Sequence, residues 1–177
     1  MKKFLILILS IISIFYICNN YKEEENVIPD KAIRFRIVAN SNTIYDQNIK
    51  LQVRNTIQNE IFKLISNSKS IEETRKILKE HQNELYDTTS NKLKELGYDK
   101  EFTLNYGYNH FPKKEYKGIT YKEGDYESLV ITLGNGEGDN FWCVLFPPLC
   151  LLEAEDNSSD IEYRFFVKDL IDKYFTK

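Results

Sequence analysis

Apolar and polar residues alternate in the segment AIRFRIVAN, residues 32–40. Ile33, Phe35 and Ile37 share one side of an extended chain, while two arginines and a valine share the other. Because successive side chains of a strand point to opposite faces of its sheet, the pattern predicts a strand with one buried face.

A helical pattern follows this strand. Apolar residues recur every four positions between Ile49 and Ile65, which predicts an amphipathic helix that packs on the sheet and ends near Ser66. Its start is marked by four consecutive residues that can cap a helix, namely Asn40, Ser41, Asn42 and Thr43.

Ser70 and Glu73 mark the start of a second helix, because a serine followed three residues later by a glutamate forms a capping box. Spacings of three and four carry an apolar stripe to Leu96, and Gly97 supplies the left-handed residue that ends many helices. We expect one continuous helix, whose stripe includes Ile71, Thr74, Leu78, His81, Leu85 and Thr89.

The second half of the chain is typical of strands. The predicted elements are a strand at residues 101–109, a polar connection with a short strand at 110–125, a strand at 126–134, a glycine-rich turn at 134–140, a strand at 141–146 and a helix at 159–174. The glycines of the turn, GNGEGDN, lead into a strand and lack the spacing of a dinucleotide-binding loop. We therefore expect a hairpin turn between two partner strands.

Residues 1–18 form a separate segment. Two lysines precede an apolar run at residues 4–17, which predicts a secretory signal peptide or a short uncleaved signal anchor. The positive-inside rule places the lysines in the cytoplasm and the remaining chain outside. Residues 19–31 are polar and acidic and predict a tether, so that residues 32–177 form a single exported domain.

Composition agrees with one globular domain. Of the 177 residues, 42% are hydrophobic and 14% aromatic, which allows a sizeable core. The predicted elements indicate an α+β fold, with an antiparallel sheet packed by amphipathic helices after the N-terminal apolar segment. The formal charge of −3 argues against a nucleic-acid partner, because phosphate binding requires a basic face.

Cys143 and Cys150 lie in the stretch NFWCVLFPPLC, which also holds the only tryptophan of the chain. A strand that turns on Pro147 and Pro148 can bring its end back to the Cα separation of about 4.4–6.8 Å that a disulfide requires. An exported domain can oxidise its cysteines. The sequence leaves a disulfide and two buried free thiols equally open.

Catalytic chemistry finds little support. The two histidines, His81 and His110, and three cysteines are too few and too irregularly spaced for a zinc site. An exported thiol hydrolase that uses Cys143 or Cys150 with His110 is one alternative, and a cell-envelope scaffold or binding module is another. A thiol in an apolar strand is usually inert, so we expect a protein with no catalytic residue, metal, cofactor or small-molecule substrate.

Three motifs of the chain resemble the stage II sporulation protein R family of endospore-forming bacteria. They are AIRFRIVANSNTIYDQNIKLQVRN, YESLVITLGNGEGDN and GDNFWCVLFPPLC, and the resemblance runs from about Ala32 to Leu152. It implies a signalling protein made in the forespore and exported into the intermembrane space that faces the mother cell. It also implies a partner, a membrane-embedded protease of the mother cell, which the signal triggers to cut a sigma factor precursor, pro-sigma-E.

We expect the activating surface around the first and last of these motifs. The candidate partner-binding residues are Asn40, Ser41, Asp46, Gln47 and Arg54 at the strand-to-helix turn, with Asn140, Trp142, Pro147 and Pro148 late in the chain. Purely structural roles stay open for some of them. Asn40 and Ser41 can cap a helix, and Trp142 can either fill the core or, if exposed, anchor an interface.

Overall fold

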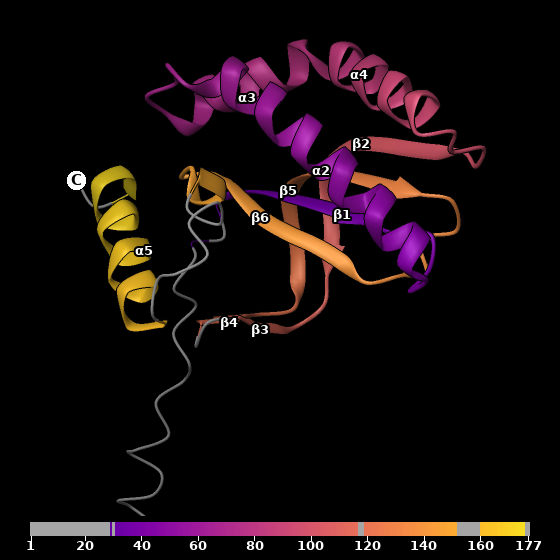
Figure 1. The fold of residues 1–177 in the computed structure, drawn as a ribbon. Helices are drawn as coiled ribbons and strands as arrows, with labels where there is room; N and C mark the ends of the chain where they lie inside the picture. The colour runs from indigo at the N-terminus through magenta and orange to yellow at the C-terminus, as the bar shows by residue number, and fades with distance from the viewer. Residues whose placement is uncertain (1–28, 30, 117–118, 152–159, 176–177) are drawn as a thin grey trace, which may run out of the picture.

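The computed structural model describes residues 29, 31–116, 119–151 and 160–175. Three helices cover one face of a four-stranded sheet, and a two-stranded hairpin and a C-terminal helix lie beside it (Figure 1). The strands are β1 (Ile33–Val38), β2 (Phe102–Phe111), β3 (Lys114–Tyr116), β4 (Ile119–Tyr121), β5 (Gly124–Leu133) and β6 (Asn140–Phe146). The helices are α2 (Ile44–Ile65), α3 (Ile71–Glu80), α4 (Gln82–Glu95), the 3-10 turn η1 (Leu149–Leu151) and α5 (Asp160–Phe175).

The predicted signal segment, residues 1–18, and most of the predicted tether lie outside the described residues. Within the part of the chain that the structure describes, no helix combines the length and the apolar character needed to cross a membrane.

Strand β1 lies at the centre of the sheet, whose order is β2-β5-β1-β6. It pairs parallel with β5 and antiparallel with β6. The α+β class is therefore confirmed, but the predicted all-antiparallel sheet is wrong, as is the predicted hairpin between β5 and β6. The connection from β1 to β5 contains three helices and the strands β2, β3 and β4, which is ample length for a parallel crossover.

The main core lies between the sheet and α2. The isoleucine and valine stripe of α2 is buried as its four-residue spacing predicts, and it packs on the apolar face of the central strands. Burial of these side chains is the main favourable contribution to folding. The core includes Ile33, Phe35, Ile37, Ile49, Val53, Ile57, Ile61, Leu129 and Ile131.

The second predicted helix is divided at His81 into α3 and α4, so the prediction of one continuous helix is wrong. Each half keeps its own buried side chains, Leu78 in α3 and Leu85 in α4. The bend lets both halves pack around α2 while the His81 ring turns outward to Glu84, 2.6 Å away. Gly97 ends α4 with a positive φ of 65°, as the sequence predicts.

Candidate partner-binding site

The end of β1 and the glycine-rich loop between β5 and β6 are tied together. We call residues 39–42 and 134–139 the clasp. Its backbone bonds run from Gly138 N–H to the Ala39 carbonyl (2.9 Å) and from Glu137 N–H to the Asn40 carbonyl (3.1 Å). A side-chain bond adds to these, because Asn42 Oδ1 accepts from the N–H of Asp139 at 2.6 Å. The loop must cross over the end of β1, because that strand separates β5 from β6.

Two glycines of the loop are required by this close approach. A Cβ on Gly138 would lie 2.3 Å from the backbone oxygen of Ser41, and one on Gly134 would lie 2.3 Å from Asn40 Oδ1. Gly134 also has a positive φ of 55°, which other residues rarely adopt. The glycines therefore serve the contact between the two segments and not a two-residue hairpin.

Asp46 anchors the clasp to the start of α2. Its Oδ2 accepts hydrogen bonds from Asn40 Nδ2 (2.8 Å) and Ser41 Oγ (2.5 Å), and the side chain is only 4% exposed. Thr43 caps the helix by accepting from the Asp46 N–H. The hydrogen bond from Ser41, followed by that from Asn40, holds the pKa of the Asp46 carboxyl below its ordinary value. A carboxylate in the first turn also suits the helix dipole.

Gln47 and Lys50 complete this arrangement. Gln47 Nε2 donates to the Ser41 carbonyl at 2.9 Å, and its Oε1 accepts from Lys50 Nζ at 2.5 Å. Lys50 Nζ reaches across to the backbone oxygen of Asp139 at 2.9 Å. Burial lowers the pKa of Lys50. The sequence prediction missed Lys50, although its position three residues after Gln47 places both on one face of the helix.

Trp142 lies on the opposite face of the sheet from the helices, where its ring meets Phe111 edge-on with centroids 5.0 Å apart. Arg36 Cζ is 5.4 Å and Lys114 Nζ 5.1 Å from the centroid of the indole ring, within the range of cation–π contacts. Asn140, with its amide oxygen turned toward Arg36, accepts from Nη2 at 2.9 Å. The half-buried indole is thus already in contact with three side chains of its own domain.

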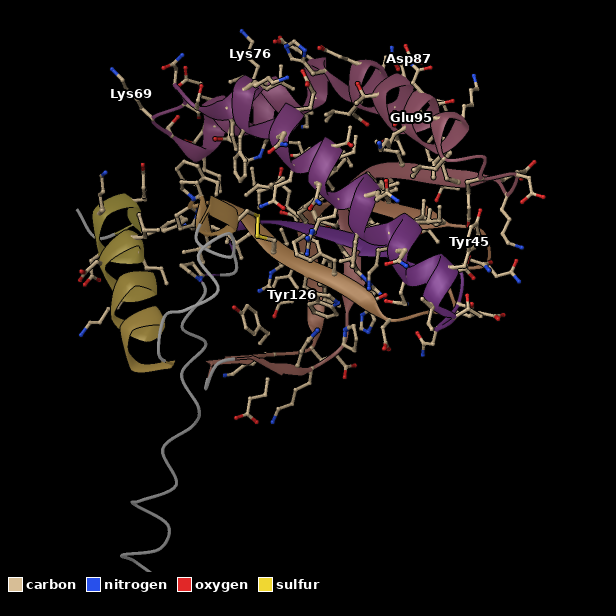
Figure 2. All side chains as sticks on the ribbon, viewed as in Figure 1. Tyr45, Lys69, Lys76, Asp87, Glu95 and Tyr126 are labelled. Carbon is tan, nitrogen blue, oxygen red and sulfur yellow. A yellow bond between two sulfur atoms is a disulfide. The ribbon has the colours of Figure 1, made fainter. Side chains whose placement is uncertain are left out.

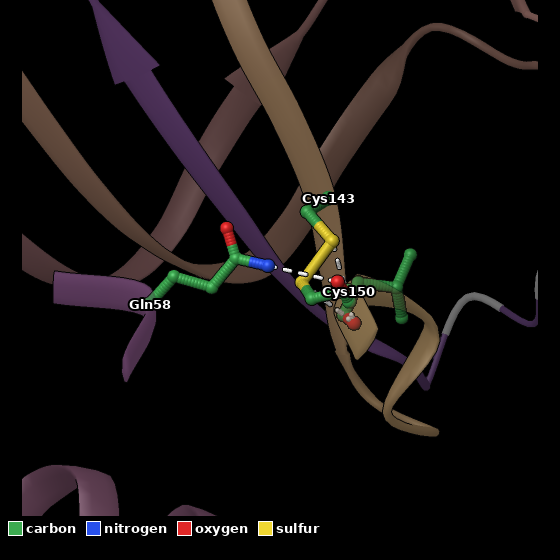
Figure 3. The surroundings of a disulfide bond; sticks show 4 residues. Gln58, Cys143 and Cys150 are labelled. Carbon is green, nitrogen blue, oxygen red and sulfur yellow. Dashed lines mark hydrogen bonds between the residues drawn. A yellow bond between two sulfur atoms is a disulfide. The ribbon is translucent and has the colours of Figure 1, made fainter. Parts of the chain in front are cut away.

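Cys143 and Cys150 are joined by a disulfide with a Cα separation of 5.4 Å (Figure 3). Between them, Pro147 is buried and Pro148 half-buried. Gln58 of α2 donates to the backbone oxygen of Cys150 at 2.8 Å and ties this turn to the helix. In this state neither sulfur is available as a nucleophile.

The remaining candidates are scattered. Arg54 lies over Phe141, 5.2 Å from the ring centroid, and donates to Asn55. His110 contacts Asp125 (3.3 Å) at the sheet edge. Among the described residues, no three His, Cys, Asp or Glu side chains are grouped as metal ligands would be. Of the predicted residues, the structure gathers Asn40, Ser41, Asp46 and Gln47 in or against the clasp, and Asn140 borders it by donating to the Gly138 carbonyl at 3.3 Å. Arg54, Trp142, Pro147 and Pro148 lie apart from it.

A second polar cluster was not predicted from the sequence. Glu127 of β5 accepts two hydrogen bonds from Arg75 of α3 (2.7 and 2.8 Å) and one from Tyr106 of β2 (2.7 Å). Burial alone would raise the pKa of Glu127, but these hydrogen bonds and the charge of Arg75 outweigh it and hold that pKa below its ordinary value. The cluster fixes α3 on the sheet.

The fold and the clasp define an α+β domain in which several polar motif residues, among them Asn40, Asn42 and Asp46, hold segments of the chain together. Comparison of the sequence with models of protein families identifies one family. A model of the stage II sporulation protein R family matches residues 29–156, and the chain belongs to this family. The resemblance predicted from the motifs is thereby confirmed, and with it a role in sporulation.

Stage II sporulation protein R of Bacillus subtilis (strain 168) is 38% identical over 133 residues. The match covers 75% of this chain and 59% of that relative, so the chain spans about three-fifths of the relative's length. No solved structure matches. Helix α5 lies beyond the part of the chain that the family model covers.

Proposed function

We propose that this protein is an exported intercellular signal of sporulation. It activates a membrane-embedded protease in the mother-cell membrane, and the protease then processes pro-sigma-E. The family match over residues 29–156 is the observation that carries the proposal. The protein acts by binding and performs no catalysis of its own.

Export across the forespore membrane into the intermembrane space is part of the proposal. It is supported by the sequence of residues 1–18, where two lysines precede an apolar run. That segment serves either as a cleaved signal peptide or as an uncleaved anchor that retains the domain at the membrane. The partner is the protease, with no role for nucleic acid or a small-molecule substrate.

The domain is built as a rigid binding module. The clasp and the Glu127 cluster join segments that are distant in sequence. The disulfide closes the turn after β6, and Gln58 ties that turn to α2. A thiol hydrolase fits less well, because a disulfide occupies both candidate sulfurs. Pre-organised surfaces bind with less loss of conformational entropy, which suits a protein that acts through contact alone.

The test is reconstitution in a host that does not sporulate. The protease and pro-sigma-E are produced together with this chain, with the chain lacking residues 1–18, or with no third protein. Immunoblotting detects the cleavage of pro-sigma-E. We expect cleavage only in the culture that produces the full chain. Equal cleavage in all three cultures, or in none, would overturn the proposal.

A further inference from the structure

The N-terminal half of α2 has an exposed surface that the clasp leaves free. Its six exposed residues are Ile44, Tyr45, Asn48, Leu51, Gln52 and Asn55, which we call the α2 stripe. At 100° per residue they fall within an arc of roughly 120° and extend about 16 Å along the helix. The stripe begins at the end of α2 that points away from α5, where Tyr45 is labelled in Figure 2.

Three of the six residues of the α2 stripe have large apolar or aromatic side chains that are exposed to solvent. Ile44 is 84% and Leu51 38% exposed, and Tyr45 stands beside them. A scattered exposed apolar side chain is ordinary, but several of them together on one helix face indicate a contact surface.

The α2 stripe also carries no charge. The neighbouring helix α3 behaves as an ordinary solvated helix, because its five exposed residues are all charged: Glu72, Glu73, Lys76, Lys79 and Glu80. The charged residues of the same half of α2 are turned elsewhere. Asp46 and Lys50 are buried against the clasp, and Arg54 lies over Phe141 and donates to Asn55, the last residue of the stripe. Depletion of charged residues together with an exposed aromatic side chain is typical of the centre of an interface.

We propose that the α2 stripe is the surface that contacts the protease, an inference that rests on the proposed function. The occupant is a single helix of the protease with an uncharged face of apolar and amide residues. A charge on that face would be desolvated against Ile44, Tyr45 and Leu51, which offer no counter-ion. The straight arc of three turns suits one helix packed alongside another.

Two other occupants fit less well. A lipid surface attracts amphipathic helices that carry exposed lysine or arginine beside the apolar stripe, whereas Lys50 is buried and Arg54 is engaged with Phe141. A second copy of the chain would need more area, because a stable interface takes roughly 20–30 residues from each partner. Six residues on one helix suit a smaller signalling contact.

The stripe lies within the first of the three motifs, residues 32–55, but its residues differ from the candidates predicted there. The polar motif residues Asn40, Asp46 and Gln47 direct their hydrogen bonds into or toward the clasp. They fix where α2 begins and which side faces solvent, so their role toward the partner is to position Ile44 and Leu51 for contact.

The test uses the reconstituted culture and three variants of the full chain. Ile44→Asp and Leu51→Glu place a carboxylate on the stripe at positions that tolerate it, since an acidic residue in the first helical turn suits the dipole and glutamate is a good helix former. Tyr108→Glu is the matched control, because Tyr108 is 76% exposed on β2, outside the stripe. We expect cleavage to fall about tenfold or more for the first two variants and to change less than about twofold for the control.

A photo-crosslinking residue at position 44, 51 or 108 identifies the occupant. We expect a crosslink to the protease from 44 and 51 and none from 108. Crosslinks between two copies, or to lipid alone, would overturn the inference, as would normal cleavage by both stripe variants. If the wild-type chain still causes cleavage in any of these outcomes, the proposed function is retained and only the contact surface is rejected. Absence of wild-type cleavage overturns the proposed function, and this partner with it.

Discussion

The side chain of Asn40 accepts a hydrogen bond from the backbone N–H of Asn135, 95 residues further along the chain, at 3.0 Å. The same amide donates to Asp46 through Nδ2. One side chain thus joins three segments: the end of β1, the glycine-rich loop and the first turn of α2.

Replacing Asn40 with Ala should destabilise the fold by about 1–3 kcal/mol, because it removes both bonds and leaves a buried carboxylate with one partner fewer. For a domain of this size the midpoint of thermal unfolding should fall by about 2–4 °C per kcal/mol. Circular dichroism measures it. The control is Asn83→Ala, since Asn83 is exposed on α4. Equal midpoints for the two variants would contradict the role of Asn40.

Gly138→Ala should destabilise more than Gly107→Ala. A Cβ at Gly138 would lie 2.3 Å from a backbone oxygen of Ser41, whereas one at Gly107 meets nothing within 4 Å. Since backbone cannot move aside as a flexible side chain can, we expect a cost of about 1–3 kcal/mol or more at Gly138. Urea unfolding of both variants measures the difference. If the two variants are equally stable, the backbone of the clasp can move to accept a Cβ at position 138, and the prediction is wrong.

The disulfide should stabilise the domain by less than about 3 kcal/mol, because its loop is shorter than the 15-residue loop for which that value is expected. The exported protein with Cys18 replaced by Ser should show no reactive thiol until it is reduced, as alkylation and mass spectrometry would detect. The double variant Cys143→Ser, Cys150→Ser should keep part of its signalling activity. Complete loss, with the protein still folded, would instead favour a thiol enzyme.

Glu127 should make stability depend on pH. Its pKa in the folded state lies below the ordinary value of 4.5, so its contribution is present above that value and is lost as pH falls through the folded pKa. Glu127→Gln should therefore be less stable near neutral pH and should lose less stability between about pH 5 and pH 3. Urea unfolding at several pH values tests this, with Asp87→Asn on the exposed face of α4 as the control. Parallel pH profiles for wild type and Glu127→Gln would contradict it.

Trp142 can be tested with two substitutions. Trp142→Ala removes the contact with Phe111 and should cost about 1–3 kcal/mol, less than a fully buried tryptophan would, because the ring is half-buried. Trp142→Phe keeps an aromatic ring against Phe111 and should retain both stability and cleavage of pro-sigma-E. Loss of cleavage in a stable Trp142→Phe protein would identify Trp142 as a docking residue.

Local periodicity allowed much of the fold to be predicted. The four-residue stripe of α2 and the cap at Ser70 depend on near neighbours, and both appear in the structure. Strand β1 also forms, but the prediction of a single buried face is wrong, because Arg34 and Val38 on its other face are buried as well. The order of strands depends on which distant segments meet. Nothing in the local pattern of residues 126–146 distinguishes a hairpin from two strands that flank β1.

The candidate site was predicted in part. The motif residues around Asn40 do gather in space, but their bonds are internal, which a sequence motif alone does not reveal. The exposure of Ile44 and Leu51 was also hidden, because an apolar residue beside a buried stripe is easily assigned to the core. One signal was visible in the sequence. Residues 51–53 and 55–59 of the predicted helix carry no charge, whereas a solvated helix face usually does, and this indicates a contact surface.

Strand β1 is the first strand of the domain, yet its partners in the sheet are β5 and β6. For a chain that crosses a membrane N-terminus first, the sheet cannot close until residue 146 has followed. Contacts of such long range form late and slowly. The chain would thus stay unfolded during transit, as threading requires, and acquire its shape only on the far side. Under the proposed export, the sheet would therefore form only after the chain has reached the far side of the membrane.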